Sequence, residues 1–502
     1  MVKLFESSKK SRIVFWLCTF VFCLLPFALF SQLGTWVAIY GGTNYDRGRG
    51  IAQTSDKGYI VCGPTSSYGM GNTDAYLLKI DSAGKYQWQN TFGGMNIENC
   101  FSVKQTNDSG FAICGYTNSF GLGGYDAYMV KTDSLGNLQW QKTFGGTDWD
   151  FTYWAEQTND GGYILAGESF SYGNNSQSYL IKTNSAGDTL WTKTFGGTNE
   201  EAAYEVHQTL DSGYILAGYT KSFGAGNADF FLIKTDSSGD TLWTKKFGNT
   251  SDDFCNSVAL CKDGGFLLGG STDSSGTPKI YFMKTDSAGK LLMSYIDTPT
   301  RGGKSVSRIR ETMDGQFVTL INSNVGGLGR QEIYLDKWNG VWAQWVKTFG
   351  GVDDDEGYNV EQTLDSGFVL VGYTASFGTG GSDNIFIAKT NRAGDYNNTI
   401  NTYISVNEIS EKNENTLIYP NPFSDNLFLK IDSIFFVKEK DFVFEISDLC
   451  GREIMRIEKN STSYLSEPIP LEIPSEKFSP GFYLASLQSG SKKIYRKLLF
   501  VR

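Results

Sequence analysis

The stretch QWQKTFGG at residues 139–146 is the part of the sequence that decides the fold, because it recurs along the chain. Clear copies are TWVAIYGG (35–42), QWQNTFGG (87–94), LWTKTFGG (190–197) and QWVKTFGG (344–351), a weaker copy is LWTKKFGN (242–249), and a degenerate one lies near 301–303. The copies follow one another at intervals of about 50 residues, which indicates one supersecondary unit repeated in tandem. Such a period excludes most ordinary enzyme folds.

Each unit is predicted to contain four short strands. In residues 95–144, runs typical of strands occupy 100–106, 111–117, 126–132 and 137–144, with a glycine-rich loop at 119–125. Four strands in about 50 residues are typical of a β-propeller blade. The fold class is therefore all-β.

Two tight turns recur in the units. An Asp or Asn at the start of a turn accepts a hydrogen bond from the backbone two residues on, and glycine supplies a positive φ. The first turn carries Asp56, Asp108, Asp160, Asp211, Asp263, Asp314 and Asp365, and the second carries Asp81, Asp133, Asn184, Asp236, Asp286 and Asn391. A lysine near the end of every third strand is expected to pair with turn acids between blades: Lys79, Lys131, Lys182, Lys234, Lys284, Lys337 and Lys389.

The number of units predicts how the ring closes. Seven units are present, but the last one lacks a tryptophan-containing fourth strand after residue 394, whereas residues 36–40 supply such a strand with no unit before it. We expect this N-terminal strand to complete the seventh blade and remove an open sheet edge. The prediction is a seven-bladed β-propeller; six or eight blades fit the sequence less well.

The pattern W-x-x-x-F-G-G, followed by D-x-G-x-x-x-x-G-x-T and D-x-x-x-x-K-x-D-x-x-G, resembles the bacterial β-propeller repeats of the SBBP type. The resemblance spans about 360 residues. It implies a propeller fold and no single activity.

The two ends of the chain predict export. Cationic residues precede the apolar run 13–30, and small Ser31 follows it, which is typical of a signal peptide over 1–31; an uncleaved anchor is the alternative. The propeller is then expected at 32–395, a polar linker at 396–416, and a small Ig-like β-sandwich at 417–502.

The last segment resembles the type A sorting domain of type IX secretion. The resemblance rests on Tyr419, Pro420, Asn421 and Pro422, on Asp448 and Gly451, on Pro480, Gly481 and Tyr483, and on the terminal KLLFVR at 497–502. It implies that the type IX secretion machinery is a partner and that the protein is secreted or held at the cell surface.

Composition narrows the ligand classes. The chain has a formal net charge of −10, which argues against nucleic acid because its binding needs a basic surface. We expect a monomer without cofactor, metal site or catalytic residue. Cys100 and Cys114 flank a turn and could pair in an oxidising compartment, whereas the alternative is that they are small buried apolar groups.

The longer loops should emerge on one face of the propeller, and function is expected there. Six units carry an acid at the start of the innermost strand, so the positions Asp46, Glu98, Asp150, Glu201, Asp253, Ser307 and Asp355 are predicted to ring the axis. These acids could bind a cation or cap loop backbones, and we favour capping. Loop aromatics could stack on sugars or plug neighbouring blades, and we favour plugging: Tyr68, Phe120, Tyr172, Phe223 and Phe377.

Departures from the repeat are the better guide to a specific site. Arg47 and Arg49 in blade 1 are assigned to the same positions as Arg308 and Arg310 in blade 6, with the acids 353–356 of blade 7 between them. The candidate ligand-binding residues are Arg47, Arg308, Asp353, Asp355 and Glu356; the alternative is a solvated charge network.

Signals for catalysis are few. The chain has a single histidine, His207, and no nucleophile triad, P-loop or dinucleotide motif. We therefore expect a binding or adhesion module for an extracellular glycan or protein. The alternatives are a carbohydrate-active enzyme, a glycosidase or lyase using paired carboxylates, and a purely structural surface-layer component.

Overall fold

The computed structural model describes residues 34–404, apart from 70, 274–275, 298–302, 325–329, 341, 379–382 and 398–399. In the C-terminal part it describes 417–419, 426–430, 441–447, 452–460, 469–472, 477–478, 481–489 and 492–500. The chain divides into two compact units, residues 1–405 and 406–502. The signal peptide predicted for residues 1–31 lies outside the described part. No helix among the described residues is long and apolar enough to cross a membrane.

The first unit consists of antiparallel sheets that follow the repeat, numbered here sheet 1 to sheet 7. Sheet 1 contains β2 (Gly50–Gln53), β3 (Tyr59–Thr65), β4 (Asp74–Ile80) and β5 (Tyr86–Phe92), and sheet 2 contains β6 (Glu98–Gln105), β7 (Phe111–Thr117), β8 (Asp126–Thr132) and β9 (Leu138–Phe144). Sheet 3 contains β10 (Asp150–Gln157), β11 (Tyr163–Ser169), β12 (Gln177–Thr183) and β13 (Thr189–Phe195), and sheet 4 contains β14 (Glu201–Gln208), β15 (Tyr214–Thr220), β16 (Asp229–Thr235) and β17 (Thr241–Phe247).

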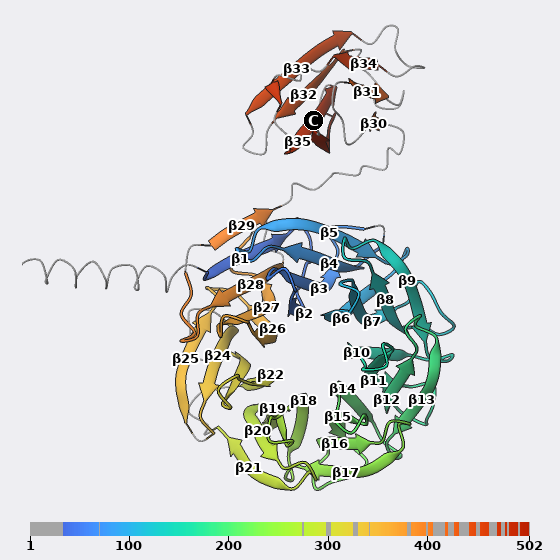
Figure 1. Cartoon of the computed structure of the whole chain (residues 1–502), viewed down its shortest axis with the longest axis vertical. Coiled ribbons are helices and arrows are strands. Elements are labelled where there is room, and N and C mark those ends of the chain that lie inside the picture. Colours follow the sequence, from blue (N-terminus) through green and yellow to red (C-terminus); the bar gives the residue numbers. More distant parts are fainter. Residues whose placement is uncertain are drawn as a thin grey trace, which may run out of the picture. The chain divides into compact units, whose positions relative to one another are not determined.

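The remaining sheets of this unit continue the same order. Sheet 5 contains β18 (Asp252–Leu260), β19 (Phe266–Asp273), β20 (Lys279–Thr285) and β21 (Leu291–Ile296), and sheet 6 contains β22 (Lys304–Glu311), β23 (Phe317–Ser323), β24 (Glu332–Trp338) and β25 (Ala343–Phe349). Sheet 7 has the order β26 (Asp355–Gln362), β27 (Phe368–Thr374), β28 (Asn384–Thr390), β1 (Trp36–Gly41) and β29 (Ile400–Ile404). Figure 1 shows the sheets following one another around a ring, with the first strand of each innermost. Such sheets are typical of a β-propeller.

The turns form as the sequence predicts. In sheet 2 the N–H of Gly110 donates to Asp108 Oδ1 at 3.0 Å, and Ser109 takes a φ of 66°. Lys131 then reaches Asp108 with its Nζ 2.9 Å from Oδ2. The expected pairing between blades is wrong: every one of the seven lysines pairs with the first-turn aspartate of its own sheet. The third strand lies beside the second, so its lysine meets the turn that begins that strand.

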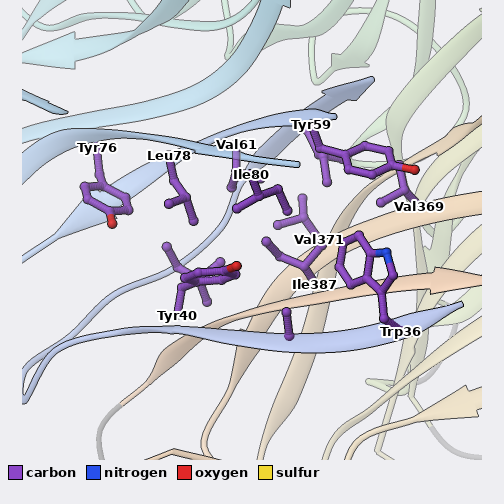
Figure 2. Packing of buried hydrophobic residues seen from close by; sticks show 13 residues of the cluster. Trp36, Tyr40, Tyr59, Val61, Tyr76, Leu78, Ile80, Val369, Val371 and Ile387 are labelled. Atoms are coloured by element: carbon purple, nitrogen blue, oxygen red, sulfur yellow. The ribbon is translucent and has the colours of Figure 1, made fainter. Parts of the chain in front are cut away.

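Apolar side chains fill the spaces between neighbouring sheets. Figure 2 shows one such cluster, in which Trp36 and Tyr40 of β1 pack with Val61 and Leu78 of sheet 1. The indole of Trp36 lies edge-on to Tyr59, 5.7 Å between ring centroids, and its Nε1 donates to the carbonyl of Ser82 at 3.0 Å. Strands buried on both faces explain the nearly continuous apolar runs in the sequence.

The N-terminal strand completes sheet 7, as the repeat predicts. β1 pairs antiparallel with β28, with Trp36 opposite Lys389 and Tyr40 opposite Ile385.

The segment after residue 396 differs from the linker that the sequence predicts there. Ile400–Ile404 forms β29, which runs parallel to β1, and Tyr396 stacks on Phe349 at 4.4 Å. The polar residues of this segment predicted a linker. Its short strand instead pairs with the free edge of β1, which is distant in sequence.

The second unit contains two sheets among its described residues. One has the order β30 (Leu417–Tyr419), β31 (Asn426–Lys430) and β34 (Ile469–Glu472), and the other has β33 (Glu453–Asn460), β32 (Asp441–Ser447), β35 (Gly481–Ser489) and β36 (Lys492–Phe500). Phe444, Ile446, Ala485 and Leu487 are buried. Tyr483 is also buried and packs edge-on against Phe478 at 4.8 Å. Of the other predicted motif residues, Pro420, Asn421, Pro422, Asp448, Gly451 and Pro480 lie outside the described part.

The five described cysteines, Cys62, Cys100, Cys114, Cys255 and Cys261, are buried free thiols. Cys100 and Cys114 are out of register, because a bulge in β6 places Cys100 opposite Gly115 and Ser102 opposite Cys114. The disulfide considered for this pair is therefore absent, and the apolar interpretation fits. Burial raises the pKa of the Cys114 thiol to about 12, so it stays protonated.

Candidate functional site

One end of the ring, called here the loop face, is defined by a backbone hydrogen bond that recurs at all seven sheet junctions. A residue near the start of the first strand donates to the residue before the third strand of the preceding sheet, at 2.7 to 3.0 Å. The donors are Asp46, Glu98, Asp150, Glu201, Asp253, Lys304 and Asp355, and their acceptors are Asp383, Thr73, Tyr125, Ser176, Ala228, Pro278 and Gln331. These bonds identify equivalent positions in every sheet, including the degenerate one.

The six carboxylates at this position hold their own loops. Glu98 accepts from the N–H of Gly94 at 2.7 Å and from Thr117 Oγ1 at 2.6 Å. Asp355 is buried and accepts from the N–H of Gly351 and from Ser376 Oγ, each at 2.7 Å. Burial raises the pKa of Asp355, although these hydrogen bonds partly offset the shift. This geometry agrees with the capping interpretation of the acidic ring.

The seventh position of that ring is Lys304 and not Ser307. Lys304 is paired with Ser323 as Glu98 is paired with Thr117, and its Nζ lies 3.1 Å from Asp297 Oδ2. In this degenerate copy the two glycines lie three residues closer to the strand than in the others, so counting from them misplaces the strand. The assignment of Arg308 and Arg310 to the positions of Arg47 and Arg49 is therefore wrong.

Arg47 lies on the loop face between sheets 7 and 1. Its Nε donates to Asp383 Oδ2 at 2.7 Å, and its Nη1 donates to the hydroxyl of Tyr358 at 3.2 Å. The guanidinium lies 3.8 Å from the ring centroid of Tyr373. Tyr358 in turn donates to Glu356 Oε2 at 2.6 Å. Arg47, Asp383, Tyr358, Tyr373 and Glu356, called here the Arg47 cluster, bring two of the predicted site residues together.

The other predicted acids of sheet 7 lie beside this cluster with different roles. Asp353 is exposed, and its backbone N–H donates to Ser376 Oγ at 2.9 Å. Asp354 accepts a bond from the N–H of Ala375 through its backbone carbonyl. The carboxylate of Asp355 is turned into its own loop, as described above. Of the predicted ligand-binding acids, Asp353 is therefore exposed, Glu356 is partly buried and Asp355 is buried.

Arg308 belongs to a separate group near the centre of the ring. Its Nη1 lies 3.0 Å from Glu205 Oε2, and Arg310 Nη2 lies 2.7 Å from Glu205 Oε1. Both guanidinium groups lie over the ring of Trp154, at 4.8 and 5.3 Å. His207 Nε2 is 3.2 Å from Glu205 Oε1. These five residues, the Glu205 cluster, join sheets 3, 4 and 6, so Arg308 is not brought to the acids of sheet 7.

The Glu205 cluster is a largely buried network of paired charges, in which Arg308 Nε and Trp154 Nε1 have no hydrogen-bond partner among the described residues. Burial alone would raise the pKa of Glu205. Attraction to Arg310 and Arg308 outweighs burial and holds this pKa well below its usual range. Burial opposes the charge of His207, but Glu156 and Glu205 raise its pKa to about 9. Both ring nitrogens of His207 have partners, since Nδ1 is 2.9 Å from Glu156 Oε2. A protonated, bonded imidazole is a poor general base.

The loop aromatics pack against aromatic side chains of their own sheets. Tyr68 stacks on Tyr76 at 5.5 Å. Phe120, Tyr172 and Phe223 contact Tyr128, Tyr179 and Phe231 of their own sheets with tilted rings. Phe377 lines a small cavity of about 230 Å³ together with Phe349, Phe386 and Tyr396. Their recurrence therefore reflects packing within the scaffold.

The sequence analysis missed a different aromatic group on the loop face. Tyr125, Trp149 and Phe170 come from three loops of sheets 2 and 3, and Phe151 comes from β10. The four rings form an uninterrupted set of contacts. The signal was present, because these aromatics break the repeat instead of following it. Among the described residues, no group of three or more His, Cys, Asp or Glu could hold a metal ion.

Residues 417–501 match the family model of the secretion system C-terminal sorting domain. The match covers the C-terminal module and confirms the sorting domain predicted there. A C-terminal sorting domain of this kind implies export through type IX secretion to the cell surface or the medium, and so interaction with that machinery.

Solved structures similar to the chain are propeller-like. A polysaccharide lyase, Uly1, has a TM-score of 0.44 and 11% identity, covering 72% of this chain and 98% of its own. The α-L-arabinofuranosidase Arb93A from Fusarium graminearum gives 0.42 and 10%, with the same coverage. The WD40 domain of Neurospora crassa Pan2 gives 0.41 and 9%, covering 68% and 89%. Similarity at this level carries no conclusion about function. The comparison with curated proteins gives no match.

Proposed function

We propose that this chain is an exported binding or adhesion module that recognises an extracellular glycan or protein on its loop face. The Arg47 cluster is the observation that carries the proposal. It combines a guanidinium, two tyrosine rings and two carboxylates from sheets 7 and 1. Aromatic residues recur at the positions of Tyr358 and Tyr373 in sheets 2 and 4. The pairing of Arg47 with Asp383 has no counterpart, because the equivalent positions of the other sheets hold no pair of opposite charges. A scaffold that repeats seven times does not need such a combination at one junction.

The architecture that supports this proposal is a seven-bladed propeller of SBBP-type repeats, closed by β1, followed by an Ig-like sorting domain. The seven sheets would be the blades, and the recurring hydrogen bonds at their junctions support a continuous ring. A signal peptide over 1–31 would start the export. In this arrangement the regular positions hold the ring together, and the irregular ones are free to bind a ligand.

A second candidate, a carbohydrate-active enzyme, is favoured by one observation. Glu168 lies on the loop face among aromatic rings, accepts from the hydroxyl of Tyr153, and has its pKa raised by burial. A carboxyl group with a raised pKa can act as a general acid in glycoside cleavage. An enzyme would also need a second carboxylate across the scissile bond.

The two functions are separated by measuring binding and turnover on the same protein. The full-length chain would be tested on a glycan array, on immobilised extracellular proteins, and in a polysaccharide-hydrolysis assay. We expect binding that is lost in Arg47→Ala and no release of products. Product release that disappears in Glu168→Gln or Glu356→Gln would replace the binding module with an enzyme. If no ligand binds, the remaining alternative is a purely structural component of the surface layer.

A further inference from the structure

Trp149 is the exposed centre of the aromatic group on the loop face. Its side chain is 49% exposed, whereas Tyr125, Phe151 and Phe170 are partly buried around it. Its ring lies nearly perpendicular to theirs, with centroids 5.7, 6.4 and 6.3 Å away. Edge-to-face contacts hold aromatic rings in a preferred geometry. We call these four residues the aromatic platform.

Backbone contacts hold the platform in place. The N–H of Asp150 donates to the carbonyl of Tyr125, and the N–H of Phe170 donates to the carbonyl of Trp149, both at 2.8 Å. Gly124 makes room for the indole, since a Cβ there would lie 2.5 Å from Trp149 Nε1. The exposed ring is thus positioned before any ligand arrives, which lowers the entropic cost of binding.

The scaffold does not require aromatics at these positions. The carbonyls equivalent to that of Tyr125 belong to Thr73, Ser176, Ala228, Pro278, Gln331 and Asp383. The residues equivalent to Trp149 are Tyr45, Ile97, Glu200, Gly303 and Asp354, and those equivalent to Phe170 are Ser66, Asn118, Lys221, Asn324 and Ala375. The same hydrogen bonds form with all of these side chains. The aromatic platform is therefore a local addition to the repeat.

The polar surroundings of the platform indicate the ligand class. Glu168 pairs with Phe151 across β10 and β11, and the exposed Asp148 precedes Trp149. None of the cation–ring contacts between described residues involves the four platform rings. A flat apolar ring bordered by carboxylate acceptors suits a sugar, which presents C–H groups on its face and hydroxyl donors at its rim. The carboxylates and the net charge of −10 disfavour an anionic ligand.

The platform is continuous with the Arg47 cluster. Tyr116 contacts Tyr125 and Phe151 at 5.2 and 5.1 Å, and Phe101 contacts Tyr116 at 5.8 Å. The guanidinium of Arg49 lies over Phe101 at 5.7 Å and over Tyr358 at 3.8 Å. Ring–ring contacts thus lead from Trp149 to Phe101, and the guanidinium of Arg49 connects Phe101 to Tyr358 of the Arg47 cluster.

We propose that the aromatic platform is a stacking subsite for a neutral polysaccharide chain, with Trp149 as its principal contact. This inference rests on the proposed function and names the ligand class of the loop face. Stacking of a sugar on the indole would supply binding that is insensitive to salt, because it does not depend on charge.

The test measures binding of the full-length chain to soluble polysaccharides by affinity electrophoresis and calorimetry. The probes are neutral β-glucan, xylan and mannan, with polygalacturonate as the anionic comparison. We expect binding to at least one neutral polymer, and Trp149→Ala should weaken it at least about tenfold. Trp149→Phe, which keeps a smaller ring, should weaken it less. Trp342→Ala is the matched control, because Trp342 is 73% exposed and lies in the turn before β25.

Four results would overturn the inference. They are equal binding by Trp149→Ala and the wild type, binding of polygalacturonate only, binding of a protein only, and no binding at all. Binding that is lost in Arg47→Ala but kept in Trp149→Ala would exclude the platform as a binding subsite and leave the proposed function intact. Failure to bind a ligand of any class would contradict both the platform and the proposed function. Unchanged melting temperatures of the variants would show that a loss of binding is not a loss of folding.

Discussion

Glu205 is a fully buried carboxylate whose charge is matched by Arg308 and Arg310. It also accepts from Ser257 Oγ at 2.7 Å and from the N–H of Val258 at 3.0 Å. Removing one partner from such a network leaves the others buried without compensation. The residue thus connects sheets 4, 5 and 6 at the centre of the ring.

We predict that Glu205→Ala lowers the free energy of unfolding by about 3–5 kcal/mol. Two arginines would remain close together without their anion. The measurement is chemical denaturation followed by tryptophan fluorescence.

Glu200→Ala is the matched control, because Glu200 is an exposed carboxylate five residues away, paired with Lys221 at the surface. Exposed pairs contribute about 0–1 kcal/mol. Equal effects of the two substitutions would contradict the assigned role of Glu205.

The residue scale also shows what sequence patterns can predict. The turn aspartates were predictable, because their hydrogen bonds reach only two residues along the chain. The partner of Arg308 was not predictable. Glu205 lies 103 residues away on another sheet, and the sequence carries no trace of that contact. Sequence counting assigned Ser307 to the position that Lys304 holds. In the degenerate copy the glycines do not mark the start of the strand, which is set by the backbone hydrogen bond of the junction.

At the scale of elements, β1 is the closure of the ring. It lies between β28 and β29 in sheet 7, and its side chains enter two different cores. Trp36 and Tyr40 pack toward sheet 1, whereas Val37 and Ile39 pack toward sheet 6 residues such as Val318 and Leu320. A strand with both faces buried contributes to both neighbouring interfaces.

We predict that Trp36→Ala destabilises the protein by about 3–5 kcal/mol, because it leaves a cavity between sheets 7 and 1 and removes the hydrogen bond to Ser82. Thermal unfolding of the full-length chain measures the effect. Trp342→Ala should change stability by no more than about 0.5 kcal/mol, since its side chain is exposed. A wild-type melting temperature for Trp36→Ala would mean that β1 does not close the ring.

At the scale of the whole molecule, the chain combines a unit of propeller-like sheets, for which we propose a recognition function, with a C-terminal sorting domain. The match of residues 417–501 to the sorting-domain family assigns the second unit. Its buried residues Phe444, Ile446 and Leu487 give it a core of its own, as an independent module requires.

We predict that deletion of 417–502 leaves the protein in the periplasm, because the truncated chain lacks the signal for crossing the outer membrane. Cell fractionation with immunoblotting and protease accessibility at the cell surface measures the outcome. In the reciprocal experiment, 417–502 fused to a periplasmic reporter should carry it outside. Surface delivery of the truncated chain would contradict the assignment.

The sequence by itself determined the repeated unit, its turns, the strand that closes the ring and the export module. These features depend on contacts within one unit or on the number of units, so local sequence patterns such as QWQKTFGG predict them. The tertiary structure alone decided which irregular residues meet. It joined Arg47 to Glu356, separated Arg308 from both, added β29 to sheet 7, and assembled the aromatic platform from three loops and the strand β10. Contacts of this kind join different sheets, and their register is set by packing around the ring.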